Sequence, residues 1–451
     1  MNTHPRRNIF FRKPNTTPYR LFFLVVMILG GIWLIRQMET GAIQSPFLPT
    51  PTPTRVAQSY ALEGDAQFEA GKLDAAITAY QEAVRVDPTN AEVWSKLARI
   101  QTYSSSTLTT DEQQRNRLQE GLASINEAIA LAPDDSAVHA MRAFVLDWNA
   151  NTTLFGEEQA ADYLLEAEQE AVRALQLDNQ NTLALAFYAE ILVDEQKWSQ
   201  AEQYILQAVE RDATLMDVHR VYAYVLESLG LYNQAIQEYD LAIAISPNLT
   251  FLHLRAGANY RRLAFGSTVP EVRTELYEKS LEYFAKAARL NEQLGIEDPV
   301  PYLSIAKTYS QEGEFFIAAR NVQKALEIDP ANADIYGQLG IVYFKSRNYE
   351  GSIPALRCAI RGCTAEESCE GRGGCGPNDV PAEVTGLELS SSTVVYYYTY
   401  GSVLSALSRP QENYCDEAMA VMAEVKAEYS GDRDIMGIVQ AGEAICQSLE
   451  E

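Results

Sequence analysis

Apolar side chains recur every three or four residues through the first half of Met216–Leu249, which predicts an amphipathic helix. His219, Tyr222 and Leu226 fall on one face of that helix. Gly230 then marks a turn, because glycine adopts backbone conformations that a Cβ atom disfavours. A second periodic stretch follows the turn. We therefore predict two helices joined by a short glycine turn.

The second predicted helix carries small residues on its apolar face. Ala235 and Ala242 flank Tyr239 at helical spacing, so two helices can approach closely at the alanines while the ring fills the space between them. Pro247 ends the helix, because proline has no N–H to continue the hydrogen-bond ladder. Two such helices cannot bury their apolar faces alone, so the unit requires neighbours.

Copies of this unit recur along the chain. The copies of 34 residues are 57–90, 182–215, 216–249 and 299–332, and a further copy begins at Ala333. Residues 91–135, 136–181 and 250–298 fit the same pattern with longer connections between their helices. A degraded ninth copy begins near Val394, and residues 432–451 form one more amphipathic segment.

A 34-residue helix–turn–helix unit in tandem resembles the tetratricopeptide repeat. The resemblance covers roughly residues 57–451. It implies an all-α solenoid of about nine units, with eight in 57–361, a cysteine- and glycine-rich inserted loop in 362–393, and a degraded ninth unit with a capping helix in 394–451. We expect the longer connections near 103–117, 149–161 and 264–275 to project from one edge, as a binding surface or as tolerated decoration.

The amino terminus predicts a membrane anchor. Residues 1–20 contain five basic side chains and no acid, and residues 21–35 are uninterrupted apolar. This order favours a signal-anchor helix at 21–38 that keeps residues 1–20 in the cytoplasm and exports the remainder. A cleaved signal peptide is the alternative, since an apolar stretch of this length also suits one. Residues 39–56 alternate threonine and proline and are expected to form a semi-rigid linker.

Charge and motifs narrow the classes of function. The net charge is −25, and it is −30 without the five basic residues of 1–20, which disfavours nucleic-acid binding by the repeats. No nucleophile elbow, phosphate-binding loop or zinc-protease motif occurs. His139, His219 and His253 occupy the fourth position of their units, which the resemblance assigns to packing. We therefore predict no enzyme activity and no metal, cofactor or small-molecule substrate.

All of the cysteines lie in the carboxy-terminal quarter. Their even number, their clustering and the predicted export favour structural disulfides, although unpaired thiols and a metal site remain alternatives and the sequence leaves the pairing open. The six residues are Cys358, Cys363, Cys369, Cys375, Cys415 and Cys446.

The resemblance also places side chains in the concave groove, through the second, fifth, ninth, twelfth and thirteenth positions of each first helix. The acidic residues at these positions are Asp65, Glu69, Asp147, Glu190 and Asp194. The candidate partner-binding residues are Arg220, Tyr224, Arg261, Arg262, Lys307, Phe344 and Lys345. The inferred groove thus changes from acidic to basic near its middle, unless these cations simply pair with neighbouring glutamates.

The residues of the chaperone-binding carboxylate clamp are missing, because Ala61 and Asp65 stand where that clamp has lysine and asparagine. The preferred hypothesis is a membrane-anchored scaffold outside the cytoplasm that binds a protein or peptide partner. The alternatives are a subunit of an envelope machine for secretion, pilus or glycan assembly, and a thiol-based enzyme of unrecognised class.

Overall fold

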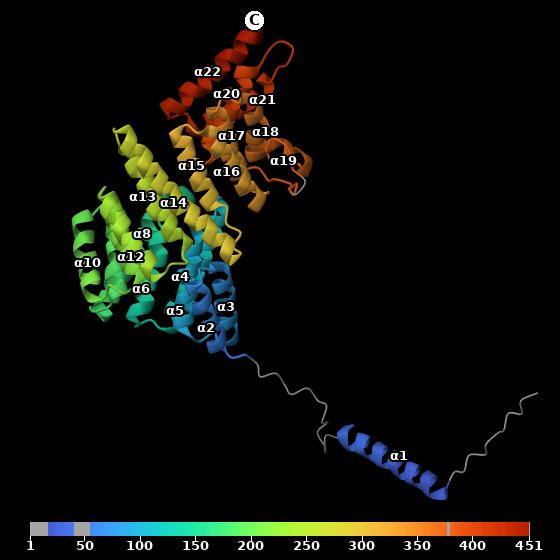
Figure 1. The fold of residues 1–451 in the computed structure, drawn as a ribbon. Helices are drawn as coiled ribbons and strands as arrows, with labels where there is room; N and C mark the ends of the chain where they lie inside the picture. The colour runs from blue at the N-terminus through green and yellow to red at the C-terminus, as the bar shows by residue number, and fades with distance from the viewer. Residues whose placement is uncertain (1–16, 40–54, 377–378, 451) are drawn as a thin grey trace, which may run out of the picture. The chain divides into compact units, whose positions relative to one another are not determined.

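The computed structural model describes residues 17–39, 55–376 and 379–450. Within these ranges the chain forms 22 helices and no β-strand beyond isolated bridges (Figure 1). The predicted all-α fold is confirmed. Two compact units, residues 1–55 and 56–451, are described separately.

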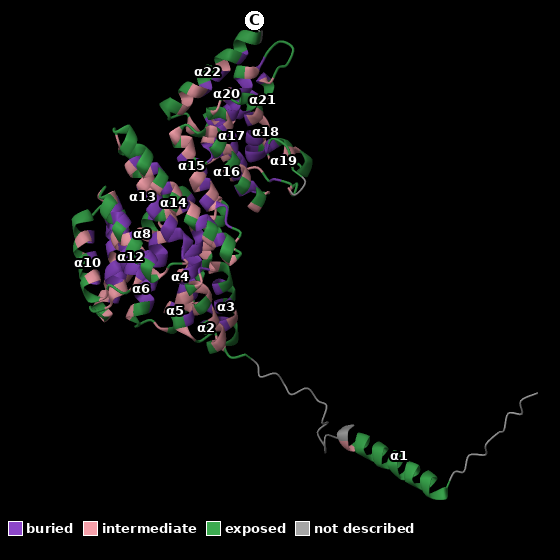
Figure 2. Ribbon diagram, in the orientation of Figure 1, coloured by how far each residue is buried: buried purple, intermediate pink, exposed green. Residues whose placement is uncertain are grey.

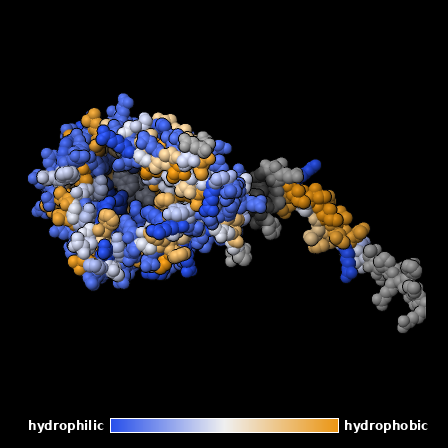
Figure 3. Space-filling view, turned by 90° about the horizontal axis from the view of Figure 1, so that it is seen from above, coloured by the Kyte–Doolittle hydropathy of each residue, from blue (hydrophilic) through white to orange (hydrophobic). Residues whose placement is uncertain are grey.

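The first unit contains α1 (Pro18–Glu39), whose apolar side chains are exposed in the space-filling view (Figure 3). Residues Pro18–Gln37 are long and apolar enough to cross a membrane, with a mean hydropathy of 2.0. Among the described helices this is the one that meets that criterion. Most of the expected basic segment (1–20) and linker (39–56) lies outside the described residues.

The second unit is a solenoid of nine helix pairs followed by one capping helix. The first five pairs are α2 (Ala57–Glu69) and α3 (Leu73–Val86), α4 (Ala91–Ser105) and α5 (Asp111–Leu131), α6 (Ser136–Asn149) and α8 (Glu157–Leu177), α9 (Thr182–Asp194) and α10 (Trp198–Arg211), and α11 (Met216–Ser228) and α12 (Tyr232–Ile245). The others are α13 (Thr250–Gly266) and α14 (Pro270–Leu294), α15 (Val300–Glu312) and α16 (Phe315–Ile328), α17 (Ala333–Lys345) and α18 (Tyr349–Arg361), and α20 (Val394–Leu407) and α21 (Cys415–Tyr429), capped by α22 (Arg433–Glu450). Two short helices, α7 (Thr152–Phe155) and α19 (Ala365–Gly371), lie in connections.

Small residues allow the two helices of a pair to pack closely. Ala235 and Ala242 of α12 are fully buried, as are the matching alanines of α10 and α16. Glycines play the same role on two first helices. An added Cβ at Gly257 of α13 would lie 2.7 Å from the Phe284 ring of α14, and one at Gly64 of α2 would lie 2.6 Å from the Tyr80 ring of α3. Each ring therefore occupies the space that the missing side chain leaves, and the buried positions follow the inner faces of the helices (Figure 2).

The turn within each regular pair has one residue in the left-handed conformation. Gly71, Gly230 and Gly313 supply it with φ between 75° and 88°. Gln196 and Arg347 occupy the equivalent positions with φ of 63°, a conformation that costs a residue with a Cβ about 1–2 kcal/mol. The turn geometry is therefore conserved between repeats even where glycine is absent.

The longer connections differ from the expected projecting loops, because much of their length is helical. Helices α5 and α8 have 21 residues and α14 has 25, against 13 or 14 in the regular units. Thr110 caps α5 and Asn151 caps α7 by accepting backbone N–H bonds. Tyr103, at the start of the first connection, is completely buried. The first insertion therefore extends the packed wall, whereas residues 265–275 of the third are largely exposed, with Phe265 73% exposed.

One superhelical turn brings the amino-terminal repeats beside later ones (Figure 1), and the turn between α2 and α3 lies near the connections before α13 and after α14. Asn248 donates to the Glu69 carbonyl over 2.9 Å. The Ser392 hydroxyl donates to Asp111 over 2.6 Å. Contacts across 179 and 281 residues of sequence therefore close the turn.

The six cysteines lie at disulfide distance in three pairs. They are Cys358–Cys363, Cys369–Cys375 and Cys415–Cys446. The first two pairs close short loops around α19, and the third joins α21 to the capping helix. No free cysteine is present in the part of the chain that the structure describes.

Candidate partner-binding groove

Five of the predicted groove residues meet at one cavity, and Figure 3 shows the helical array hollowed on one face. Asp147 of α6, Glu190 and Asp194 of α9, and Arg220 and Tyr224 of α11 border one cavity of about 610 Å³. First helices of successive repeats supply them, since helices stacked in one direction present the same positions to the inner side. Three of the five predicted acidic residues and the first candidate cation thus meet in one place.

Arg220 has a structural role in this wall. Only 6% of the residue is exposed, and its guanidinium binds both Glu190 carboxylate oxygens over 2.6 and 2.7 Å. It also lies over the rings of Phe144 and Trp148, with its carbon 5.5 and 5.8 Å from their centroids. A bidentate pair enclosed by aromatic rings holds α9 against α11 and leaves little of the cation for a partner.

A polar clasp links the second repeat to the fifth. Asp217 of α11 is 4% exposed and accepts hydrogen bonds from the Tyr103 hydroxyl and from Arg99, both on α4. The Arg220 Nε donates to the same Tyr103 hydroxyl over 3.1 Å. Arg99, Tyr103 and Asp217 occupy groove positions of their repeats but were not among the predicted groove residues. Nothing in the sequence shows that repeats so far apart meet.

Two carboxyl groups in the cavity share a hydrogen bond. Asp147 is 5% exposed and its carboxyl contacts that of Asp194, which also accepts from the Tyr224 hydroxyl over 2.5 Å. Burial, with the neighbouring carboxylates, raises the pKa of Asp147 well above its ordinary value. Burial also raises the pKa of Asp194 to about 6. Two carboxyl groups in contact cannot both be ionised without strong repulsion, so the pair holds a proton more strongly than an isolated aspartate does.

Arg262 and Arg261 differ although they are adjacent on α13. Arg262 pairs with the buried carboxylate of Glu227. Arg261 donates to the Ser304 carbonyl over 3.1 Å and lies 5.2 Å over the Phe284 ring. Burial and the neighbouring Arg262 cation lower the pKa of Arg261 to about 10, so the group remains charged at neutral pH.

Lys307 of α15 and Lys345 of α17 extend this basic stretch of the groove, and both side chains are exposed. The surrounding wall removes water from the Lys307 ammonium, and this desolvation, with the nearby cations of Arg261, Arg262 and Lys345, lowers the pKa of Lys307. Phe344, 37% exposed, stands beside Lys345. Within the described ranges, neither lysine nor Arg261 has a carboxylate within 4.0 Å. We call Arg261, Lys307, Phe344 and Lys345 the basic groove.

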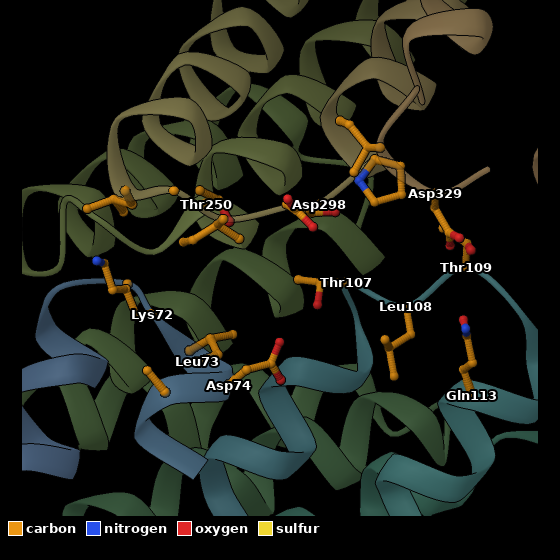
Figure 4. Close-up of a pocket in the computed structure, with 18 residues that line it drawn as sticks. Lys72, Leu73, Asp74, Thr107, Leu108, Thr109, Gln113, Thr250, Asp298 and Asp329 are labelled. Atoms are coloured by element: carbon orange, nitrogen blue, oxygen red, sulfur yellow. The ribbon is translucent and has the colours of Figure 1, made fainter. Parts of the chain in front are cut away.

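At the amino-terminal end, Asp65 accepts from Tyr80 over 2.6 Å and pairs with Lys96 over 3.1 Å, so its charge is neutralised within the wall. A second cavity of about 560 Å³ lies where the superhelical turn closes (Figure 4). Asp74 and Asp298 point toward it from opposite walls (Figure 4). Burial raises the pKa of Asp298 to about 6. This second cavity therefore has a buried acid at its wall.

The repeat histidines have packing roles. His139, His219 and His253 are buried, and each binds through Nε2 the carbonyl six residues earlier. His219 also contacts Glu238 over 2.7 Å. The same bond in three units ties the start of each first helix to the preceding loop. The described residues contain no cluster of histidine, cysteine and acidic side chains arranged for a metal.

Comparison with known families agrees with this geometry. A family model described as TPR repeat matches residues 64–101, and one described as tetratricopeptide repeat matches residues 188–249. These two stretches contain tetratricopeptide repeats. No curated protein matches the chain significantly in sequence.

Two solved structures of human IFIT1 share the fold of the helical array. The human IFIT1 dimer with m7Gppp-AAAA has a TM-score of 0.53 and 15% identity over 91% of this chain and 92% of that one. The human IFIT1 dimer with PPP-AAAA has a TM-score of 0.52 and 15% identity over 88% and 92%. TTC0263, a TPR protein of Thermus thermophilus, matches 45% of this chain and 98% of its own at a TM-score of 0.37 and 17% identity. At identities this low, the two IFIT1 structures show a common fold and nothing about ligands.

Proposed function

We propose that this chain is a non-catalytic scaffold that is anchored in a membrane by α1 and holds its repeats outside the cytoplasm. The apolar helix Pro18–Gln37 supports the anchor. The three cysteine pairs support an oxidising location for the repeats, because disulfides persist mainly in such compartments. The repeats supply an extended concave wall, the surface that solenoids use for binding.

We further propose that the basic groove binds an acidic segment of a partner protein. The observation that carries this proposal is that Arg261, Lys307 and Lys345 lie together with no carboxylate partner in the part of the chain that the structure describes, on a chain whose net charge is −25. Like charges held together repel one another, and a bound carboxylate relieves that repulsion. Phe344 adds apolar area beside the cations.

The test is photo-crosslinking in living cells, with a photoreactive residue at Phe344 in the full chain and mass spectrometry of the products. The double variant Lys307→Glu, Lys345→Glu should reduce the crosslinked partner about tenfold or more, since each 1.4 kcal/mol of lost binding is a factor of ten. Arg320→Glu is the matched control, because Arg320 is exposed on the second helix of the same repeat as Lys307. Circular dichroism melting should be alike in both variants.

Equal crosslinking in the groove variant and the control would contradict the groove assignment. Protease accessibility in intact and permeabilised cells tests the orientation separately, and cleavage of the repeats in intact cells stripped of any outer layer is the expected result. A stoichiometric complex that co-purifies from membranes would favour the alternative role as a subunit of an envelope machine.

A further inference from the structure

The cavity between the third and sixth repeats has a lining unlike that of the basic groove. Helices α6, α9, α11 and α13 supply its charged residues, which are Asp147, Glu190, Asp194, Arg220 and Arg255. Trp148 and Phe251 supply aromatic surface, and Leu154 of α7 lies at its border. A volume of about 610 Å³ is within the range of small-molecule sites, which are about 300–1,000 Å³.

Among the described residues, the pairings inside this cavity leave one carboxyl oxygen and one guanidinium without a hydrogen-bond partner. Glu190 and Arg220 neutralise each other through their bidentate contact. The Oδ1 atom of Asp147 is buried and has no hydrogen-bond partner. Arg255 is reached by solvent, and in the described part of the chain its guanidinium has no ion pair or hydrogen bond.

A buried carboxylate oxygen without a partner costs about 1–3 kcal/mol or more in a folded protein. The neighbouring Asp194 increases that cost, because two carboxylates in contact cannot both be ionised without strong repulsion. An ammonium group beside the two aspartates would replace the shared proton and satisfy the free oxygen. Arg255 interacts electrostatically with Asp194. A ligand carboxylate beside Arg255 would accept the hydrogen bonds that its guanidinium can still donate.

We infer that this cavity binds a small zwitterion carrying an ammonium and a carboxylate group, of the amino-acid class. The Asp147–Asp194 pair holds the ammonium, Arg255 holds the carboxylate, and Trp148 and Phe251 contact the apolar part. This site is independent of the basic groove and of any protein partner there.

Two unsatisfied groups favour a zwitterion over a simple cation. An ammonium that displaces the proton of the aspartate pair leaves the net charge of the cavity unchanged, but the Arg255 guanidinium still lacks a hydrogen-bond acceptor among the described residues. A ligand with both groups satisfies the Asp147 oxygen and the Arg255 donors together, and its ammonium competes with protonation of the pair. Glu190 also faces the two aspartates, but it is already paired with Arg220. The pH dependence of binding should therefore come from Asp147 and Asp194.

The experiment uses the full chain in detergent micelles and a panel of the twenty L-amino acids, each measured by isothermal titration calorimetry at pH 7.5 and 5.5. Butylamine and butyrate serve as probes with only one of the two charges. At least one amino acid should bind, and its affinity should fall as the pH falls, because protons then occupy the aspartate pair.

Two isosteric variants assign the site. Asp147→Asn and Arg255→Gln should each weaken binding about tenfold or more. Arg289→Gln is the matched control, since Arg289 is exposed on α14 outside the cavity, and it should bind like the unaltered chain. Far-ultraviolet circular dichroism confirms that each variant is folded.

Absence of heat with every amino acid would overturn the inference, as would equal affinity in Arg255→Gln and the control. Butylamine binding as tightly as the best amino acid would overturn the zwitterion assignment and reduce the site to a cation site. Because the basic groove lies elsewhere, failure here leaves the crosslinking test at Phe344 unaffected.

Discussion

The clasp between α4 and α11 should decide how firmly the superhelical turn is closed. Asp217→Ala removes the acceptor of the Tyr103 hydroxyl and of Arg99 in one step. Removing one partner of a buried ion pair costs about 3–5 kcal/mol. The Asp217 side chain is 5% exposed and that of Arg99 is 20% exposed, so Arg99 regains some solvation and the expected cost is about 3 kcal/mol.

Hydrogen exchange measures this cost where it arises. A loss of about 3 kcal/mol speeds the exchange of the slow α4 and α11 amides about 100-fold, because each 1.4 kcal/mol is a factor of ten in the opening equilibrium. Amides of α20 and α21, which lie in the carboxy-terminal units, should exchange as before. Asp162→Ala is the control, since Asp162 is exposed on α8, and it should change stability by no more than about 0.5 kcal/mol.

A double-mutant cycle separates the ion pair from general damage. Arg99→Ala combined with Asp217→Ala should cost less than the two single changes added together, by about 1–3 kcal/mol. Additive costs, or exchange in Asp217→Ala no faster than in Asp162→Ala, would refute the idea that this pair holds the turn closed.

Three further outcomes follow from other parts of the array. Asp194 and Asp298 have pKa values of about 6, above the 3.8 of the unfolded chain, so the free energy of unfolding should rise by about 1 kcal/mol for each group as the pH falls from 7.5 to 5.5. In urea titrations followed by circular dichroism, Asp298→Asn should remove the Asp298 share of that rise. An undiminished rise in this variant would contradict the assignment. Gly257→Ala should destabilise by about 1–3 kcal/mol through the Phe284 ring, whereas Gly437→Ala on α22, where an added Cβ meets no atom, should stabilise slightly in the same titrations. Replacing Cys415 and Cys446 by serine should cost about 2–4 kcal/mol, seen as faster exchange of α22, and unchanged exchange would count against a stabilising disulfide there.

The architecture of the repeats was predictable because it depends on short-range patterns. The spacing of Tyr222, Leu226, Ala235 and Ala242 specifies which faces two neighbouring helices bury, and Gly230 specifies the turn between them. These interactions span at most one repeat, so periodicity and residue size are enough to infer them. The all-α fold, the number of helix pairs and the capping helix followed from this pattern.

The helical form of the long connections was not predictable from their length. Residues 103–117 could equally form a loop, and only their packing shows Tyr103 buried and α5 extended. The cysteine pairs were likewise open, because six cysteines allow many pairings and only the path of the chain brings Cys415 to Cys446.

The state of the groove charges depended on the tertiary structure alone. Arg220, Arg261 and Arg262 look alike in the sequence, yet one lies in a buried bidentate pair, one pairs with Glu227, and Arg261 has no carboxylate partner. Sequence periodicity determines which side of a helix a residue occupies. The superhelical turn determines what stands opposite it, because the fields of charges from repeats more than a hundred residues apart act through space and not along the chain.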